Sequence, residues 1–532
     1  MIDKHHIYLL LSFIFCFLST GTAENFNVQN YGAIGDGETV STEAIQKAID
    51  DCAKTGGTVY FPAGTFLSGS IFLKSNVALH LDHGAVLLGS TNQDDYPVTI
   101  PEYRSYTDNY VIRSLIYAEK AEHISIYGRG TIDGQGKAFK DRRTRQQPYK
   151  RRPYLIRMIE CRDISIKDIT LLNSPMWVQH YLACEDVLID GISVHSLVAG
   201  NNYGIDIDSC YRVRITNCHI VSGDDAIVLK STSNRACRNV VVNNCILRSN
   251  CNGFKLGTES NGGFNNIVFS NSTVYDTRLA AIALETVDGG ILERVDVSNI
   301  IISNAGTAIF VRLGNRARPF LSKGPGGTKG DFIALAGAQT PGIGSLQRVS
   351  ISHIIADSIG DIGCSITGIP EKAVQDIRLD DIHITYAGGG TMDMANAIVP
   401  EHEKRYPEYS MFGHLPAYGF YVRHVDGISM HSMRLTLTKS DLRPALVFDD
   451  VQDIDLFDFD AEMNGETSAL VRMTNVNGGW IHGCRLTKQV PYFVQLENSA
   501  NLKITNNDFS RIGTIIKEPA GSSSKNMILN HN

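Results

Sequence analysis

The sequence predicts an all-β protein, a single-domain parallel β-helix with a capping helix near its N-terminus. Three observations lead to this prediction. Short alternating strands recur roughly every 25 residues along most of the chain. Asparagine returns at one position of successive repeats. Glycine is abundant, at 48 of 532 residues, as expected for many turns between many short strands. Because stacked repeats form one solenoid, we expect residues 24–532 to be a single domain.

The first residues are predicted to be an export signal. Lys4 gives a short positive region, residues 7–18 form an apolar run, and residues 21–23 offer a small-residue cleavage site. We therefore expect a signal peptide over residues 1–23 and a mature chain exported to the periplasm or outside the cell. The apolar run is too short to span a bilayer, so no membrane insertion is expected.

An amphipathic helix is predicted over residues 41–54, between a glycine-rich stretch at 31–37 and the pair Gly56-Gly57. Its apolar residues recur at the spacing of one helix face. The end of a solenoid needs a cover, so we assign this helix as the N-terminal cap. The apolar stripe consists of Ala44, Ile45, Ala48, Ile49 and Cys52.

Strands with period-two alternation then follow one another along nearly the whole chain, and each is expected to bury one face. A helix-free repeat of roughly 25 residues fits a parallel β-helix. Leucine-rich repeats would need a Leu/Asn signature that is missing, and a propeller would need a longer period. The clearest strands begin at residues 164, 187, 213, 240, 267 and 295.

One asparagine column falls at a turn in four successive repeats. Asparagine tolerates the left-handed backbone conformation, and its side chain can hydrogen-bond from one coil to the next. We therefore interpret this column as structural. Its members are Asn217, Asn244, Asn271 and Asn299.

Two long segments, residues 314–344 and 388–423, interrupt the repeats. Loops of this length in a compact repeat protein are usually functional or disordered. The second is too aromatic for a disordered segment, and we expect it to form a wall of a binding cleft. Its aromatic and imidazole side chains include Tyr406, Tyr409, Phe412, His414 and Tyr418.

Composition narrows the possible partners. The chain has 49 Lys and Arg against 56 Asp and Glu, a net charge of −7. This balance argues against nucleic acid or an anionic membrane surface as a partner. The cysteines beyond the predicted signal show neither a CxxC pair nor a zinc spacing, so we interpret most of them as small buried hydrophobes. We expect no metal and no cofactor, and a monomeric chain.

Alignment of the central strands predicts which side chains share a face. The second and fourth positions of each five-residue segment are apolar and should point inward, so the third and fifth should point outward. Successive coils lie about 4.8 Å apart, which places the outward charges close together. One outward column is Asp206, Val228, Lys255, Ala283 and Phe310, and its neighbour is Asp208, Lys230, Gly257, Glu285 and Arg312.

These columns create the densest carboxylate cluster of the chain. One interpretation is a solvated ladder of alternating charge. The pair Asp224-Asp225 beside Asp206, however, crowds like charges, which raises at least one carboxyl pKa. A protonated carboxyl group beside an ionised one is the requirement of glycoside hydrolysis. The members are Asp206, Asp208, Asp224, Asp225, Glu259 and Glu285, with Lys230 and Lys255 among them.

The motif Gly223-Asp224-Asp225, preceded by the segment Asn-Asn-Tyr-Gly-Ile-Asp at residues 201–206, resembles the active-site pattern of the polygalacturonase family, glycoside hydrolase family 28. The segments at 31–37, 58–64 and 173–177 are also similar to bacterial members. The resemblance extends over about residues 26–302. It implies a right-handed parallel β-helix that hydrolyses pectin with inversion.

The sequence departs from that family pattern at three motifs. Tyr203 stands where the family has a catalytic Asp, and Asn252 stands where it has a His. Ala283 and Glu285 stand where the family has the Arg and Lys that grip the galacturonate carboxylate. A carboxylate at Glu285 would repel another carboxylate. A neutral sugar such as rhamnose, galactose or arabinose is therefore expected at the cleavage point of a pectin-related glycan.

The resemblance and the cluster together suggest roles. Asp225 is the predicted general acid, and Asp224 and Asp206 are predicted to position or activate water. The other predicted site residues would bind sugar or line the cleft. These are Tyr203, Asp208, Lys230, Asn252, Lys255, Glu259, Glu285, Arg312 and His180.

Two other functions remain open from the sequence. A polysaccharide lyase on the same fold would use a base such as Lys230 or Lys255, usually with calcium. A non-catalytic glycan-binding relative is the other, because Tyr203 replaces a family catalytic group.

Overall fold

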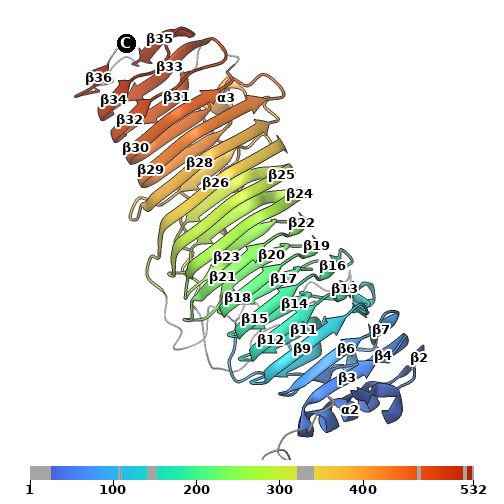
Figure 1. Cartoon of the computed structure of the whole chain (residues 1–532). Coiled ribbons are helices and arrows are strands. Elements are labelled where there is room, and N and C mark those ends of the chain that lie inside the picture. The colour runs from blue at the N-terminus through green and yellow to red at the C-terminus, as the bar shows by residue number, and fades with distance from the viewer. Residues whose placement is uncertain are drawn as a thin grey trace, which may run out of the picture.

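The computed structural model describes residues 25–105, 108, 111–139, 152–319, 341–463, 469–518 and 524–529. Its coils stack along one axis, from α2 at the N-terminal end to β36 at the C-terminal end (Figure 1). Every pairing between named strands is parallel, and three parallel sheets result, with each coil contributing in turn to each. The predicted signal peptide, residues 1–23, lies outside the described residues.

The first sheet carries the predicted site. Its register pairs Asp206 with Val228 and Asp208 with Lys230. The long strands β24 (Phe264–Thr286), β25 (Ile291–Leu313), β29 (Phe420–Leu437) and β30 (Leu446–Ala461) contribute to it as well as to the other sheets. Its remaining strands are β5 (Ile71–Phe72), β8 (Ser114–Glu119), β11 (Tyr154–Ile159), β14 (Gln179–Leu182), β17 (Ile205–Asp208), β20 (Ile227–Ser231), β23 (Phe254–Ser260), β27 (Cys364–Thr367), β31 (Ala469–Thr474), β33 (Val490–Glu497) and β35 (Ile512–Lys517).

The second sheet follows the first within each coil. Two strands, β26 (Ser345–Ile359) and β28 (Val374–Tyr386), continue from it into the third sheet. Its other strands are β1 (Asn25–Asn27), β3 (Gly57–Phe61), β6 (Val77–Leu81), β9 (Glu122–Gly128), β12 (Arg162–Lys167), β15 (Glu185–Asp190), β18 (Tyr211–Thr216), β21 (Cys237–Asn243), β32 (Asn477–His482), β34 (Ala500–Thr505) and β36 (Ile528–Leu529).

The third sheet completes each coil before the turn that leads to the next strand of the first sheet. Its separate strands are β2 (Asp36–Val40), β4 (Gly64–Ser68), β7 (Ala85–Gly89), β10 (Thr131–Asp133), β13 (Thr170–Leu172), β16 (Ser193–Ser196), β19 (His219–Ser222) and β22 (Ile246–Ser249).

The N-terminal cap is confirmed as the helix α2 (Thr42–Thr55), within one residue of its predicted bounds. Ile45, Ala48, Ile49 and Cys52 are fully buried against the first coils. The other helices of the described residues are short: α3 (Met392–Ala395) and the 3-10 turns η1 (Val28–Tyr31), η2 (Gln93–Asp95) and η4 (Gly136–Phe139). Among the described residues, no helix has the length and apolar character needed to cross a bilayer.

The predicted alternation of the central strands is also confirmed. Ile205 and Ile207 point into the solenoid and are fully buried in the main core. Outside the solenoid, the outer face of the first sheet is covered in part by the second interruption. There Ala283 and Phe310 of the sheet pack with Met411, Phe412 and Leu415 of the interruption in a second apolar cluster. The outward columns are therefore largely shielded from solvent.

The asparagine column adopts the predicted conformation. Its four residues have φ between 50° and 62°, the left-handed region. The side chains join neighbouring coils: Asn299 Nδ2 donates to Asn271 Oδ1 at 2.7 Å, and Asn217 Nδ2 donates to Asp190 Oδ1 at 2.8 Å. The described cysteines are free thiols, and all of them except Cys251 are buried, as expected for small core residues.

Replacement of Asn271 tests the column. Asn271→Ala should lower the free energy of unfolding by about 2 kcal/mol. Alanine is less favourable than asparagine in the left-handed backbone conformation, and the substitution also removes the hydrogen bond with Asn299. Asn271→Gly loses only the hydrogen bond and should be less destabilised. Urea unfolding of the two variants measures the difference, and equal losses would contradict the backbone argument.

Candidate active site

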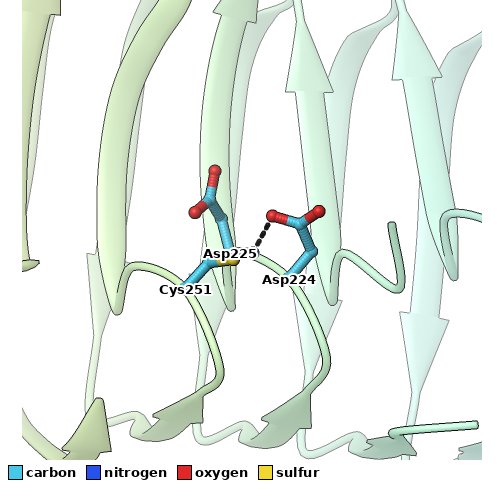
Figure 2. A group of neighbouring side chains, drawn as sticks. All are labelled: Asp224, Asp225 and Cys251. Atoms are coloured by element: carbon cyan, nitrogen blue, oxygen red, sulfur yellow. Dashed lines mark hydrogen bonds between the residues drawn. The ribbon is translucent and has the colours of Figure 1, made fainter. Parts of the chain in front are cut away.

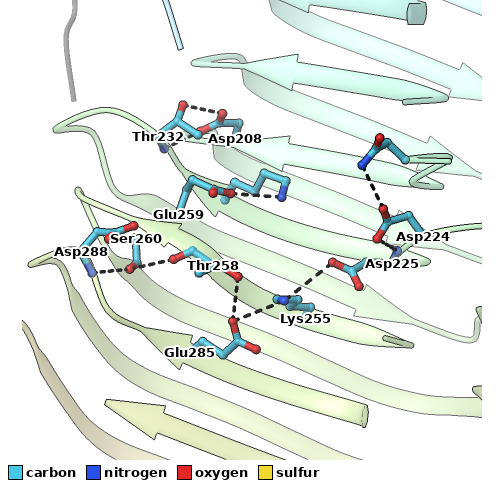
Figure 3. Close-up of polar contacts among 12 residues, drawn as sticks. Asp208, Asp224, Asp225, Thr232, Lys255, Thr258, Glu259, Ser260, Glu285 and Asp288 are labelled. Carbon is cyan, nitrogen blue, oxygen red and sulfur yellow. Dashed lines mark hydrogen bonds and ion pairs between the residues drawn. The ribbon is translucent and has the colours of Figure 1, made fainter. Parts of the chain in front are cut away.

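The predicted site lies on the outer face of β17, β20 and β23, at the turns that lead into these strands. Asp224 and Asp225 occupy the turn between β19 and β20, and Lys255 and Glu285 follow on the next coils (Figure 3). The parallel register places Val228 beside Lys255 and Lys255 beside Ala283, as the aligned columns predict. Charges distant in sequence are thereby gathered on adjacent coils.

Asp225 is held by two donors on one oxygen. Its Oδ1 accepts a hydrogen bond from the Asn252 backbone N at 3.0 Å and another from Asn252 Nδ2 at 2.8 Å. Asn252 is itself fixed, because its Oδ1 accepts from the backbone N of Ala280 at 3.0 Å. The other oxygen of Asp225 lies 4.0 Å from Lys255 Nζ. Every one of these neighbours is a donor or a cation, a setting that suits a carboxylate acting as an acceptor.

Asp224 has a different environment although it is the adjacent residue. Its Oδ1 accepts from the Asp225 backbone N at 3.0 Å, and its Oδ2 lies 3.5 Å from Asn201 Nδ2. No cation forms an ion pair with it among the described residues. Burial, followed by the charge of Asp225, raises the pKa of Asp224 to about 6. Asp224 can thus hold a proton close to neutral pH.

Cys251 completes a small group with the two aspartates, whose ligand atoms all lie within 4.8 Å of one another (Figure 2). Burial and the charges of Asp224 and Asp225 raise the pKa of the Cys251 thiol. A protonated thiol is a hydrogen-bond donor. Cys251 therefore acts here as a donor toward Asp224.

Asp206 is fully buried on β17, one coil before β20. Neither of its carboxyl oxygens has a hydrogen-bond partner within the described part of the chain. Burial is the largest cause that raises the pKa of Asp206 well above its ordinary value; Lys230 opposes the shift, and Asp225 and Asp224 add to it. Asp206 consequently favours its protonated form more than an exposed aspartate does.

Lys230 is already paired. Its Nζ lies 3.3 Å from Glu259 Oε2, 4.7 Å from the centroid of the Tyr203 ring and 5.1 Å from that of Trp177. Glu259 also forms an ion pair with Arg318, in which Arg318 Nη1 lies 3.0 Å from Glu259 Oε1. Although burial opposes it, Lys230 and the two arginines Arg316 and Arg318 hold the pKa of Glu259 well below its usual range. The lysine and glutamate therefore satisfy each other within a larger ionic network.

Lys255 is paired in the same way on the next coil. Its Nζ lies 3.4 Å from Glu285 Oε2, which also accepts from Thr258 Oγ1 at 3.1 Å. Burial raises the pKa of Glu285 to about 8, although Lys255 opposes that shift. The ring of Tyr406, from the second interruption, lies 5.6 Å from Lys255 Nζ. The interruption thus reaches the candidate site, as predicted for a wall of a cleft.

Tyr203 stands at the position where the family pattern has an aspartate and this chain has none. Its ring lies 5.0 Å from that of Trp177 and packs in a small apolar cluster with Val111, Tyr154 and Met176. It is partly exposed, and it forms an aromatic surface beside Lys230. This surface is of the kind on which a sugar ring can stack.

The remaining predicted residues make structural contacts. Asp208 Oδ2 accepts from Thr232 Oγ1 at 2.6 Å and lies 3.4 Å from His180 Nε2, with both Asp208 and His180 fully buried. Burial lowers the pKa of His180. Arg312 donates to the backbone oxygens of Gly368 and Glu401, each at 2.8 Å, and so anchors the second interruption.

The structure adds residues that the sequence reasoning did not select. Arg316 and Arg318 follow β25 and bind Glu259. Glu408 lies on the interruption near Lys255 and Asp225; burial raises its pKa, and Lys255 opposes the shift. The basic pair in the first interruption and the Tyr406-Pro407-Glu408 segment were visible as side-chain types. Their target coils could not be deduced without the path of the loops.

Comparison with known proteins finds a matching family model over part of the chain. Residues 53–314 match the model of the family described as glycosyl hydrolases family 28. A protein from Vitis vinifera named "Probable polygalacturonase" is 39% identical over 219 residues, which cover 39% of this chain and 45% of that protein. One from Aspergillus oryzae named "Probable rhamnogalacturonase A" is 29% identical, over 40% of this chain and 41% of its own. The chain thus spans less than half the length of these curated relatives.

Solved structures resemble the fold. The exopolygalacturonase from Thermotoga maritima superposes with a TM-score of 0.57 at 24% identity, covering 68% of this chain and 87% of that one. A family 28 exopolygalacturonase from Yersinia enterocolitica gives 0.53 at 18% identity, covering 94% of this chain and 79% of its own. At this identity the likeness concerns the fold, an all-β parallel solenoid as predicted.

The raised pKa of Glu285 predicts a pH dependence of stability. The folded protein keeps this proton up to about pH 8, whereas the ordinary value is 4.5, so the folded state binds more protons between these limits. The stabilisation is fully present below pH 4.5 and is lost as the pH rises through about 8. The free energy of unfolding should therefore decrease less from pH 5 to pH 8 in Glu285→Gln than in the wild type. Urea unfolding at both pH values measures this, with the exposed Glu371→Gln as control; identical slopes for all three proteins would contradict it.

Proposed function

We propose that this protein is a glycoside hydrolase that cleaves O-glycosidic bonds in pectin-related plant polysaccharides, because residues 53–314 match the model of glycosyl hydrolases family 28. The relatives named for polygalacturonase and rhamnogalacturonase support a pectic substrate. The apolar segment at residues 7–18 supports export of the mature chain, which would bring the enzyme to such a polymer.

The observation that carries the proposal is the contrast between two adjacent carboxyl groups. Asp224 has a pKa raised to about 6, and Asp225 accepts two hydrogen bonds from Asn252 and faces Lys255. Glycosidases use two carboxyl groups in different environments, so that one can act as the general acid and the other as the general base.

The two residues take the following roles. Asp224 donates its proton to the glycosidic oxygen as the bond to the anomeric carbon breaks. Asp225, oriented by Asn252, accepts a proton from the water that attacks that carbon. This assignment exchanges the roles suggested by sequence alone, because the pKa shift favours Asp224 as the proton donor. Asp206 is buried and has no hydrogen-bond partner among the described residues, and burial, followed by the charges of Asp225 and Asp224, raises its pKa, which suits a group that tunes the acid pair.

We further propose that the sugar at the cleavage point is neutral. A uronate carboxylate needs a free cation, and both lysines of the site are already engaged. Lys230 is paired with Glu259, and Lys255 Nζ lies between Glu285 Oε2 at 3.4 Å and Asp225 Oδ2 at 4.0 Å. Sugar hydroxyl groups can instead exchange hydrogen bonds with these pairs, and Tyr203 offers a stacking surface.

Substitution of the two aspartates tests the proposal. Asp224→Asn and Asp225→Asn should each lower kcat about a thousandfold on whichever neutral or acidic pectic oligosaccharide the wild type cleaves best. Wild-type activity should fall as the pH rises above about 6, because Asp224 then loses its proton. The measurement is product release across a substrate panel, with the exposed Asp426→Asn as matched control.

Other results would overturn specific parts. An unsaturated, ultraviolet-absorbing product would identify a lyase. Tight binding of a glycan without turnover would identify a binding protein in which Tyr203 replaces a catalytic group. Efficient cleavage between galacturonates would contradict the neutral-sugar assignment.

A further inference from the structure

A second concave surface runs along the turns that follow the third sheet. It has a volume of about 780 Å³, within the range of about 300–1,000 Å³ typical of ligand sites. We call it the edge groove, and define it by Arg248, Asp276, Arg278 and Lys439 with the backbone of residues 304–306 and 358–360. The edge groove lies beside the candidate active site, and none of its lining residues belongs to that site.

The register makes the groove long and straight. Arg248 pairs with Tyr275, Tyr275 with Ser303, and Ser303 with Asp357 on successive coils. The same ladder continues through β28 to β29 (Figure 1). Lys439 follows the end of β29, which is at Leu437. Because coils are spaced by about 4.8 Å, six coils extend the groove over roughly 24 Å. This length suits an extended oligosaccharide.

The groove is cationic although the chain as a whole carries a net charge of −7. Its lining contains three cations, Arg248, Arg278 and Lys439, against one carboxylate, Asp276. Asp276 Oδ1 already accepts from Asn304 Nδ2 at 2.7 Å, so it is tied to the coil ladder. Arg278 Nε donates to the Asn250 backbone oxygen at 2.6 Å and forms no ion pair within the described part of the chain. The cations therefore exceed their partners.

Arg248 adds a hydrogen-bond donor that is not satisfied within the described residues. Its Nη1 is buried and has no hydrogen-bond partner among the residues that the structure describes. A buried guanidinium nitrogen without a partner is costly, and a carboxylate is the group that guanidinium binds best, through two parallel hydrogen bonds. The lining of the groove is thus more complete with a carboxylate bound.

The edge groove comes close to the acid pair at Arg278. Arg278 Nη2 lies 3.8 Å from Cys251 Sγ, and Cys251 is the donor next to Asp224. A glycan whose cleaved bond lies at Asp224 and Asp225 can therefore continue past Arg278 into the groove. No charged residue of the pairs at Lys230 and Lys255 lines it.

We propose that the edge groove binds the uronate-bearing part of the substrate, with Arg248, Arg278 and Lys439 receiving its carboxylates. The inference rests on the proposed function for the identity of the chain as a glycan. It deepens that function, because the substrate then combines a neutral sugar at the cleavage point with acidic sugars in the neighbouring stretch.

Direct binding tests the groove without requiring turnover. The host is the full chain with Asp225→Asn, and the ligands are an oligogalacturonide and its fully methyl-esterified form. Lys439→Gln, which changes an exposed residue, and Arg248→Gln should each weaken binding of the acidic ligand about tenfold by calorimetry. The methyl ester should bind the host weakly and be unaffected by either change.

A matched control separates local from general charge effects. Lys503→Gln removes one exposed lysine from the outer face of β34, and it should leave binding of the acidic ligand unchanged. Equal losses in Lys503→Gln and Lys439→Gln, equal affinity for the two ligands, or no binding of the acidic ligand by the host would each overturn the inference. Loss of acidic binding in Lys439→Gln alone supports it even where the wild type releases no product.

Discussion

The in-register parallel stacking of coils is the constraint on which the rest of the structure depends. Each coil repeats the last at about 4.8 Å, so a side chain at one strand position always meets the corresponding side chain of the next coil. The buried isoleucines turn this repetition into a continuous core. On the outside, the same repetition brings Lys255 against Glu285 and Asp225 against Asn252, although these residues lie about one coil apart in sequence.

Burial then gives these neighbours their chemical character. The second interruption packs on the outer face through Phe412 and Leu415 and brings Tyr406 over Lys255. In this shielded setting the two lysines keep their glutamate partners, while Asp224, which has no cation of its own among the described residues, holds a proton to about pH 6. The same stacking that creates the core thus also separates a proton donor from an acceptor on adjacent residues.

The sequence predicted the parts that depend on periodicity. The cap, the inward alternation and the left-handed asparagine column all follow from local pattern, and all are present. The columns of outward residues could also be aligned, because register in a solenoid is set by the repeat. The sequence could not show that Asp208 and His180 are fully buried, that Arg312 anchors a loop, or that Arg318 binds Glu259. These contacts depend on where two long interruptions fold back, and no repeat governs their path.

The central claim is that Asp224 is the protonated member of the acid pair. Infrared difference spectroscopy between pH 5 and pH 8 measures this directly, through the carbonyl stretch of protonated carboxyl groups. We predict a component that disappears with a midpoint near pH 6 in the wild type and in Asp426→Asn, and that is absent from Asp224→Asn. Persistence of the component with a midpoint near pH 6 in Asp224→Asn would contradict the account, because another carboxyl group would then carry that proton. The component of Glu285, with its midpoint near pH 8, should remain in all three proteins.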